Sequence, residues 1–210
     1  MTTDTPIVFV VDDDSRVREA LTDLLSSNGL RVQAFECART FLESDKPDSP
    51  ACLVLDLELP DINGLELQEE LASTIAPPIV FITGYGDIPS SVRAMKAGAV
   101  EFLSKPFGED ELLRAIDTAI ALDRAARLKR LEVAKLQAHY DRLTPREREV
   151  LPFVVAGFLN KQTAGDLGTS EITIGVHRGA IMRKMEARSL AELVRMADKL
   201  GIPPHPLSSK

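Results

Sequence analysis

Three consecutive aspartates, Asp12, Asp13 and Asp14, follow an apolar stretch near the N-terminus, in the sequence VFVVDDDS. Carboxylates held close together repel one another and raise one another's pKa unless a cation lies between them. A hard divalent ion such as Mg²⁺ takes oxygen ligands of this kind. The triplet therefore indicates a metal-binding pocket. The alternative is a solvated strand end in a chain that has 32 acidic residues.

Three further residues have complementary chemistry: Asp56 in LVLDLELPDINGLEL, Thr83 in VFITGYGD and Lys105 in EFLSKPF. A carboxylate can act as a nucleophile, while a hydroxyl and an ammonium can hold the oxygens of an arriving phosphoryl group. A metal ion can offset the charge of that group. Together with the aspartate triplet, these residues predict a reaction site for phosphoryl transfer.

The hydrophobic pattern of residues 1–120 predicts the elements that position this site. Short apolar runs, which predict strands, alternate with amphipathic segments, which predict helices. Strands buried on both faces and separated by helices indicate an α/β domain with a doubly wound, five-stranded parallel sheet. Ligands bind outside the carboxyl ends of such strands, and each group named above follows or ends a predicted strand. The strands are expected at 7–11, 31–35, 52–57, 78–83 and 100–104, and the helices at 16–27, 38–43, 64–73, 89–97 and from 110 onward.

The order Asp-Asp, Asp, Thr, Lys-Pro resembles the flavodoxin-like receiver domain of bacterial two-component response regulators, across nearly all of residues 6–120. The resemblance implies that a sensor histidine kinase transfers a phosphoryl group to Asp56. It also implies Mg²⁺ as a cofactor, bound by the carboxylates of Asp12, Asp13 and Asp56 and by the backbone carbonyl of Glu58.

The same resemblance implies that Thr83 and Lys105 bind the phosphoryl oxygens. Phe102 matches the aromatic switch position, where rotation of the ring is coupled to Thr83; the alternative is an ordinary core phenylalanine. A receiver promotes its own phosphorylation and dephosphorylation with Mg²⁺, so the chain is not expected to be an enzyme in the usual sense. The Lys105-Pro106 bond is often cis in receivers, but the sequence does not give its isomer.

The charge of the chain, −7 overall, is divided unevenly along its 210 residues. Residues 1–120 have 22 acidic and 9 basic side chains, whereas residues 142–210 have 7 and 11. We therefore expect an acidic domain (1–121), a helical linker (122–142) and a basic domain (143–210). No apolar run is long enough to cross a membrane and no signal peptide is evident, so the sequence predicts a cytoplasmic protein that does not associate with membranes.

The basic part begins with a clear helix start. Thr144 is placed as an N-cap, Pro145 at the first helical position and Glu147 to complete a capping box. Helices are expected next at 161–167 and 171–185, separated by a turn at Gly168. Two helices about a glycine turn indicate an all-α helix-turn-helix domain.

The segments LTPREREVL and GFLNKQTAGDLGTSEITIGVHRGAIMRKMEARSLAELVRMA resemble the LuxR/FixJ-type output domain. The resemblance implies that the third helix enters the major groove of double-stranded DNA and that a fourth, at about 190–200, is available for dimerisation. The alternative to DNA binding is that the long basic side chains of this domain form an ordinary basic surface. The residues expected at DNA are Lys161, Thr173, Gly175, Val176, His177, Arg178, Arg183 and Lys184.

Gly175 and Gly179 lie four residues apart on one face of the third helix, where each costs about 1 kcal/mol relative to alanine. Their presence indicates close approach to the groove, with Val176 touching a thymine methyl and Arg178 contacting a phosphate or a guanine. The alternative is sequence drift in a weakly selective binder.

The linker contains neither Gly nor Pro and has leucines at Leu122, Leu128, Leu131 and Leu136. We expect a solvated helical connector rather than a coiled coil, because the leucines are spaced unevenly for heptads.

These observations predict a regulator of the two-component LuxR/FixJ type that a kinase phosphorylates and that then binds promoter DNA as a homodimer. A Mg²⁺-dependent phosphohydrolase would explain the acidic pocket but not residues 143–202, and an RNA-binding antiterminator would share the receiver.

Overall fold

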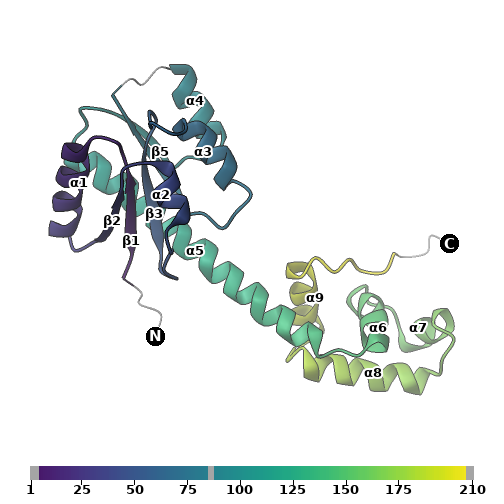
Figure 1. Cartoon of the computed structure of the whole chain (residues 1–210). Coiled ribbons are helices and arrows are strands. Elements are labelled where there is room, and N and C mark those ends of the chain that lie inside the picture. The colour runs from purple at the N-terminus through teal and green to yellow at the C-terminus, as the bar shows by residue number, and fades with distance from the viewer. Residues whose placement is uncertain (1–4, 85–87, 207–210) are drawn as a thin grey trace. The chain divides into compact units, whose positions relative to one another are not determined.

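The computed structural model describes residues 5–84 and 88–206. The chain divides into two compact units, Met1–Arg127 and Leu128–Lys210. The long helix α5 (Glu109–Asp141) contributes its first part to the first unit and its last part to the second (Figure 1). In the part of the chain that is described, no helix is long and apolar enough to cross a membrane.

In the described residues of the first unit, five parallel strands form one sheet in the order β2-β1-β3-β4-β5, the flavodoxin-like order of doubly wound folds. The predicted fold class is confirmed, and each predicted boundary differs from the observed one by no more than two residues. The strands are β1 (Ile7–Val11), β2 (Arg31–Phe35), β3 (Ala51–Asp56), β4 (Ile79–Thr83) and β5 (Glu101–Ser104). The helices before α5 are α1 (Ser15–Ser27), α2 (Ala38–Glu43), α3 (Gly64–Leu71) and α4 (Ile88–Lys96).

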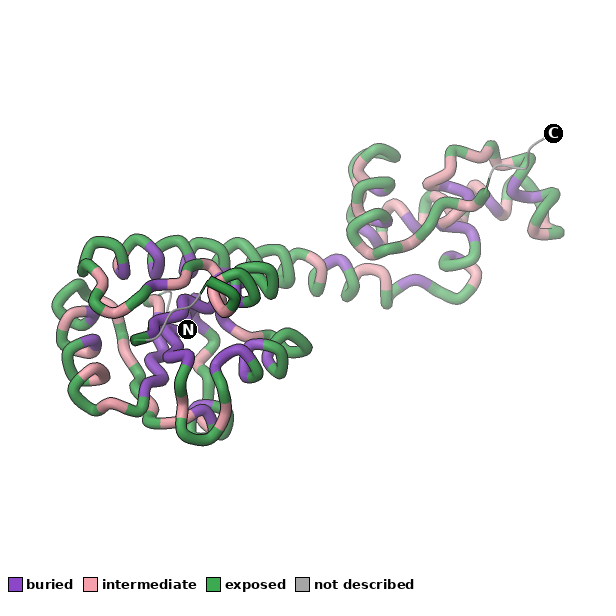
Figure 2. The backbone as a smooth tube through the Cα atoms, turned by 90° about the horizontal axis from the view of Figure 1, so that it is seen from above, coloured by how far each residue is buried: buried purple, intermediate pink, exposed green. Residues whose placement is uncertain are grey.

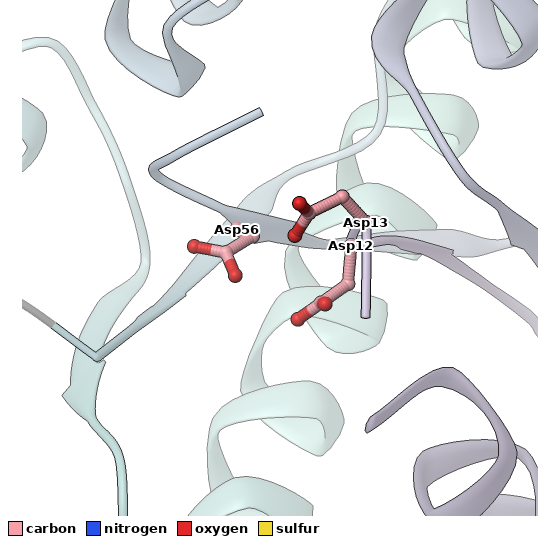
Figure 3. Close-up of side chains that lie close together, drawn as sticks. All are labelled: Asp12, Asp13 and Asp56. Atoms are coloured by element: carbon pink, nitrogen blue, oxygen red, sulfur yellow. The ribbon is translucent and has the colours of Figure 1, made fainter. Parts of the chain in front are cut away.

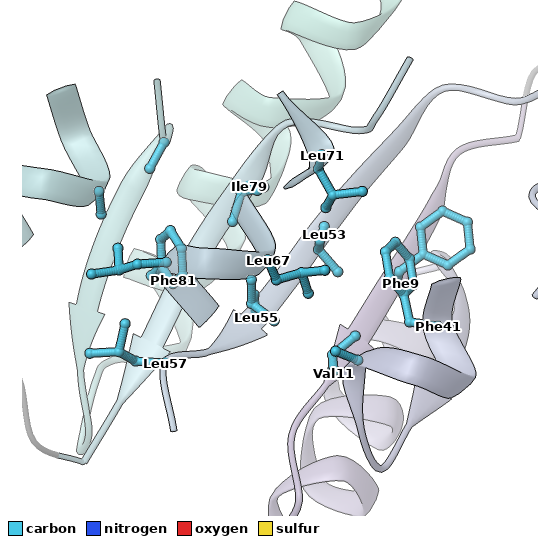
Figure 4. Packing of buried hydrophobic residues seen from close by; sticks show 14 of the residues in the cluster. Phe9, Val11, Phe41, Leu53, Leu55, Leu57, Leu67, Leu71, Ile79 and Phe81 are labelled. Atoms are coloured by element: carbon cyan, nitrogen blue, oxygen red, sulfur yellow. The ribbon is translucent and has the colours of Figure 1, made fainter. Parts of the chain in front are cut away.

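Alternate side chains of the strands enter two separate hydrophobic clusters, as the period of a β-strand requires. Phe9 and Phe81 belong to the cluster beneath α2, α3 and α4, which Figure 4 shows. Val8 and Ile82 belong to the cluster beneath α1 and α5. In Figure 2 the buried positions of this unit gather in its interior.

The prediction that every strand is buried on both faces is wrong for the sheet edges. β1, β3 and β4 are buried throughout, but β2 is exposed or half-buried at each position and β5 buries only Leu103. An edge strand has a neighbour on one side only, so helices cover less of it.

The second unit is helical, with α6 (Pro145–Val155), α7 (Asn160–Asp166), α8 (Glu171–Lys184) and α9 (Leu190–Lys199). The capping box predicted at the start of α6 is confirmed. The Thr144 side chain accepts a hydrogen bond from the backbone N–H of Glu147, and the Glu147 carboxylate accepts one from that of Thr144. Ile174, Ile181 and Leu193 lie in the core that these helices share.

Residues 122–142 are not a uniformly solvated connector. Asp123 is buried and accepts hydrogen bonds from the backbone N–H of Ala51 (2.9 Å) and from Arg127 Nε (2.7 Å) in the first unit. Leu136 is buried in the second unit, whereas Leu122, Leu128 and Leu131 are exposed. A dimer seam made of all four leucines is therefore not available, because tertiary packing already uses Leu136.

Candidate functional site

The carboxyl ends of the strands bring the predicted receiver residues together. Asp12 and Asp13 directly follow β1, and Asp56 ends β3. Ligand oxygens of these three carboxylates lie within 4.8 Å of one another, and Figure 3 shows their side chains gathered at this edge. Thr83 ends β4 and is fully buried, and Lys105 follows β5.

Lys105 links two of the carboxylates. Its Nζ donates hydrogen bonds of 2.7 Å to Asp12 Oδ2 and of 2.7 Å to Asp56 Oδ2. The backbone N–H of Lys105 donates to the carbonyl of Thr83 (2.7 Å), and the Lys105-Pro106 bond is cis. The other oxygen of Asp56, Oδ1, accepts a hydrogen bond from the backbone N–H of Glu58 (3.1 Å). The Asp56 carboxylate is thus held at both oxygens.

The electrostatics of the site reflect burial and close pairing. Burial raises the pKa of Asp12, although Lys105 and the backbone N–H of Asp14 act in the opposite direction. Burial alone would lower the pKa of Lys105, but its bonds to Asp12 and Asp56 outweigh that effect and raise the pKa. The lysine therefore stays an ammonium, which can hold an anionic group.

The donor set fits a hard divalent cation. Among the described residues, Asp12, Asp13 and Asp56 offer only oxygen atoms, and Asp13 is exposed to solvent. Mg²⁺ prefers oxygen ligands and keeps part of its water shell, which suits a site that is open on one side. Residues 58 and 63 form an isolated bridge that closes the loop after Asp56.

Asp61 in this loop is a positioning residue that sequence reasoning missed. Its carboxylate accepts hydrogen bonds from the backbone N–H groups of Ala38 (3.2 Å) and Arg39 (2.9 Å), and so caps α2. The residue at the N-cap of α2, Cys37, makes no side-chain cap. The available sequence signal was a predicted helix preceded by Cys37, a residue with no side-chain oxygen that could cap it. The sequence does not show which residue supplies the cap instead, because Asp61 lies 22 or more positions away.

The glycine of the loop is required by close packing. A Cβ atom at Gly64 would lie 2.7 Å from the backbone oxygen of Asp56 and 3.1 Å from Leu57 Cα. The start of α3 can therefore approach the strand that presents Asp56 only because this residue is glycine.

Phe102, the predicted switch residue, is half-buried on the edge strand β5. Its ring centroid lies 6.0 Å from that of Phe81, at a tilt of 38°. The ring is neither enclosed in the core nor free, and its role as a switch stays a prediction.

The predicted DNA contacts in the second unit differ in exposure and in their partners. Lys161, Val176 and Arg183 are exposed, and Thr173 and Gly175 are half-buried. His177, Arg178 and Lys184 are also half-buried, and two of these have partners inside the unit. Arg178 donates to the carbonyl of Phe158 (2.8 Å), and Lys184 Nζ donates to Glu147 Oε2 (2.7 Å).

Two families match this chain. The family described as Response regulator receiver domain matches residues 8–117. The family described as Bacterial regulatory proteins, luxR family, matches residues 141–197.

Related proteins cover nearly the whole chain. Nodulation protein W of Bradyrhizobium diazoefficiens is 53% identical over 93% of this chain and 87% of its own length. Transcriptional regulatory protein FixJ of the same organism is 40% identical over 93% and 96%. The low-resolution structure of the response regulator StyR matches with a TM-score of 0.80 and 50% identity, over 93% of this chain and 99% of that chain.

Proposed function

Because the chain belongs to the response regulators that join a receiver domain to a LuxR-type DNA-binding domain, and so is a phosphorylation-dependent transcription regulator, we propose that Asp56 is its phosphoacceptor. A sensor histidine kinase donates the phosphoryl group, and the phosphorylated chain binds promoter DNA as a homodimer. The family is one of transcription regulators rather than of classical enzymes. The observation that carries the proposal is the juxtaposition of Asp12, Asp13, Asp56 and Lys105.

The proposed reaction uses the Asp56 carboxylate as nucleophile. One of its oxygens attacks the phosphorus of a kinase phosphohistidine, an O–P bond forms as the P–N bond breaks, and the histidine leaves. Lys105, which already contacts Asp56 Oδ2, and Thr83 hold the phosphoryl oxygens. Asp12, Asp13, Asp56 and the backbone carbonyl of Glu58 would hold a Mg²⁺ ion, which would supply charge compensation for the transferred group.

We also propose the receiver domain as residues 1–121, the helical linker as 122–142 and the DNA-binding domain as 143–210. Since promoter DNA is its proposed partner, we propose the cytoplasm as its place of action.

Asp13→Ala is expected to weaken Mg²⁺ binding about tenfold or more while leaving the nucleophile in place. Asp13 makes neither of the two Lys105 contacts, so the substitution removes a ligand without freeing the lysine. Calorimetric titration of Mg²⁺ into both proteins measures the effect. Asp14→Asn is the matched control, because Asp14 is in the same triplet but outside the cluster of three carboxylates. An unchanged affinity in Asp13→Ala would remove Asp13 from the ligand set.

Phosphorylation is expected to convert the chain from monomer to dimer, because a phosphoryl group shifts the population toward the state that binds it better. The family resemblance places the dimer contact on residues 89–122, and Val92, Met95 and Leu122 are exposed there. Sedimentation velocity with and without beryllofluoride should show the mass doubling. Asp56→Asn should stay monomeric under both conditions. A mass that beryllofluoride leaves unchanged at every protein concentration contradicts the dimer.

Binding to double-stranded DNA distinguishes this function from its alternatives. The beryllofluoride-treated chain should bind DNA duplexes in preference to RNA duplexes, with an affinity that falls as salt rises. Preference for RNA would favour an antiterminator. Steady turnover of small phosphate esters without nucleic-acid binding would favour a phosphohydrolase.

A further inference from the structure

The outward face of α8 has an unusual composition for a helix in a basic unit. Ile172 is 82% exposed and Val176 is 66% exposed, whereas Ile174 and Ile181 on the opposite face are fully buried. Exposed aliphatic side chains of this size are commonly scattered singly. These two lie four residues apart, one helical turn, and so form one apolar surface. Ile172 did not appear among the DNA contacts expected from sequence.

The rest of this face has one position without a side chain, Gly179, and one cation, Arg183. Ile172, Val176, Gly179 and Arg183 follow one another at the spacings of a single helical stripe. A Cβ atom at Gly179 would meet nothing within 4 Å, and one at Gly175 would make only an ordinary contact with Asn160. The fold therefore requires neither glycine, and the stripe contains no carboxylate.

Charge complementarity indicates what covers this face. Arg183 is exposed on the same stripe as the apolar pair, and Lys161 is exposed on the neighbouring helix α7. Both lie in a segment, residues 142–210, with more basic than acidic side chains. A polyanion with apolar groups on its surface fits such a face better than an apolar protein surface does. The major groove of DNA is of this kind, because each thymine presents a C5-methyl group there between two phosphate backbones.

We propose that Ile172 and Val176 read two thymine methyl groups in the major groove, and that the missing side chain at Gly179 lets α8 approach closely enough for both contacts. The inference rests on the proposed DNA-binding function and names its sequence preference. The two side chains are about 6 Å apart along the helix axis. We therefore expect the thymines within about two base-pair steps of each other, since one step is about 3.4 Å. Arg178 Nη1 already donates to the backbone carbonyl of Phe158, so we expect this arginine to position the helix rather than to read bases.

Removal of single methyl groups from DNA tests the proposal. A duplex is first enriched from a randomised library with the full chain treated with beryllofluoride. Each thymine is then replaced in turn by deoxyuridine, which lacks only the methyl group. The wild type should bind about three- to fourfold more weakly at two positions, the effect of one lost methyl contact. Ile172→Ala should be insensitive to deoxyuridine at one of these positions, and Val176→Ala at the other.

Ile75→Ala is the matched control, because Ile75 is 74% exposed in the other unit and should retain sensitivity at both positions. If every deoxyuridine duplex binds as tightly as the parent, or if the alanine variants keep the wild-type sensitivity, methyl reading is overturned while DNA binding stands. The same holds if Ile172→Ala binds all duplexes like the wild type, the result expected when a protein partner occupies this face. If the library yields no enriched duplex, the proposed function fails, and the inference fails with it.

Discussion

Asp56→Asn is expected to abolish phosphorylation of the chain by acetyl phosphate or by a cognate kinase. The substitution removes the nucleophilic carboxylate oxygen but keeps an oxygen that can accept the bond from the backbone N–H of Glu58. The measurement is incorporation of an acid-stable, hydroxylamine-labile phosphoryl label. Loss should be complete, because Asp56 is the residue that we propose as nucleophile, and the substitution removes its carboxylate.

Asp14→Asn is the control for this experiment. Asp14 lies in the same acidic triplet and caps α1, a role that asparagine also fills. This variant should be labelled like the wild type. Undiminished labelling of Asp56→Asn would instead assign the phosphoryl group to another residue.

Lys184→Met is expected to destabilise the second unit by about 2 kcal/mol, which lowers its unfolding temperature by about 10 °C. The Glu147 side chain is only 7% exposed, and Lys184 Nζ lies 2.7 Å from its Oε2. Removal of the ammonium leaves a buried carboxylate with the backbone N–H of Thr144 as its remaining donor in the capping box. We expect a smaller loss of stability than for a fully buried ion pair, because the Lys184 side chain is 25% exposed. Thermal unfolding of the full chain measures it.

Arg183→Met is the matched control, since it removes a neighbouring cation from the same helix. Arg183 is exposed on the outward face, so stability should change by no more than about 0.5 kcal/mol. Its affinity for DNA should fall for all sequences, and the salt dependence should become shallower by about one unit. Equal unfolding temperatures for wild type and Lys184→Met would show that Lys184 is not structural.

The pH dependence of stability gives an independent readout of the same pair. Burial alone would raise the pKa of Glu147, but the bonds from Lys184 and Thr144 outweigh it and lower the pKa. The contribution of Glu147 to folding stability is therefore fully present above its unfolded-state pKa of 4.5. It is lost as the pH falls through the lower pKa that Glu147 has in the folded state. The stability difference between wild type and Lys184→Met should shrink below pH 4.5. A difference that stays constant down to acid pH would contradict this origin.

Local patterns were sufficient to predict the elements and the residues that gather at the acidic edge. The period of the apolar residues predicts whether a segment is a strand or a helix. Thr144, Pro145 and Glu147 indicate the start of a helix within four positions. The gathering of Asp12, Asp56 and Lys105 followed from a general rule about where parallel strands end. Each inference depended on neighbours in sequence or on a property of the whole fold class.

Only the tertiary structure decided which side chains of each element are free. Arg183 and Lys184 are adjacent cations, yet one faces outward and the other meets Glu147, because packing on α6 sets the rotation of α8 about its own axis. The same rotation exposes Ile172, which by composition alone would be assigned to the core. Likewise, the cap that Asp61 provides for α2 joins segments distant in sequence. Such contacts depend on how elements meet in three dimensions, and no periodicity within one element encodes them.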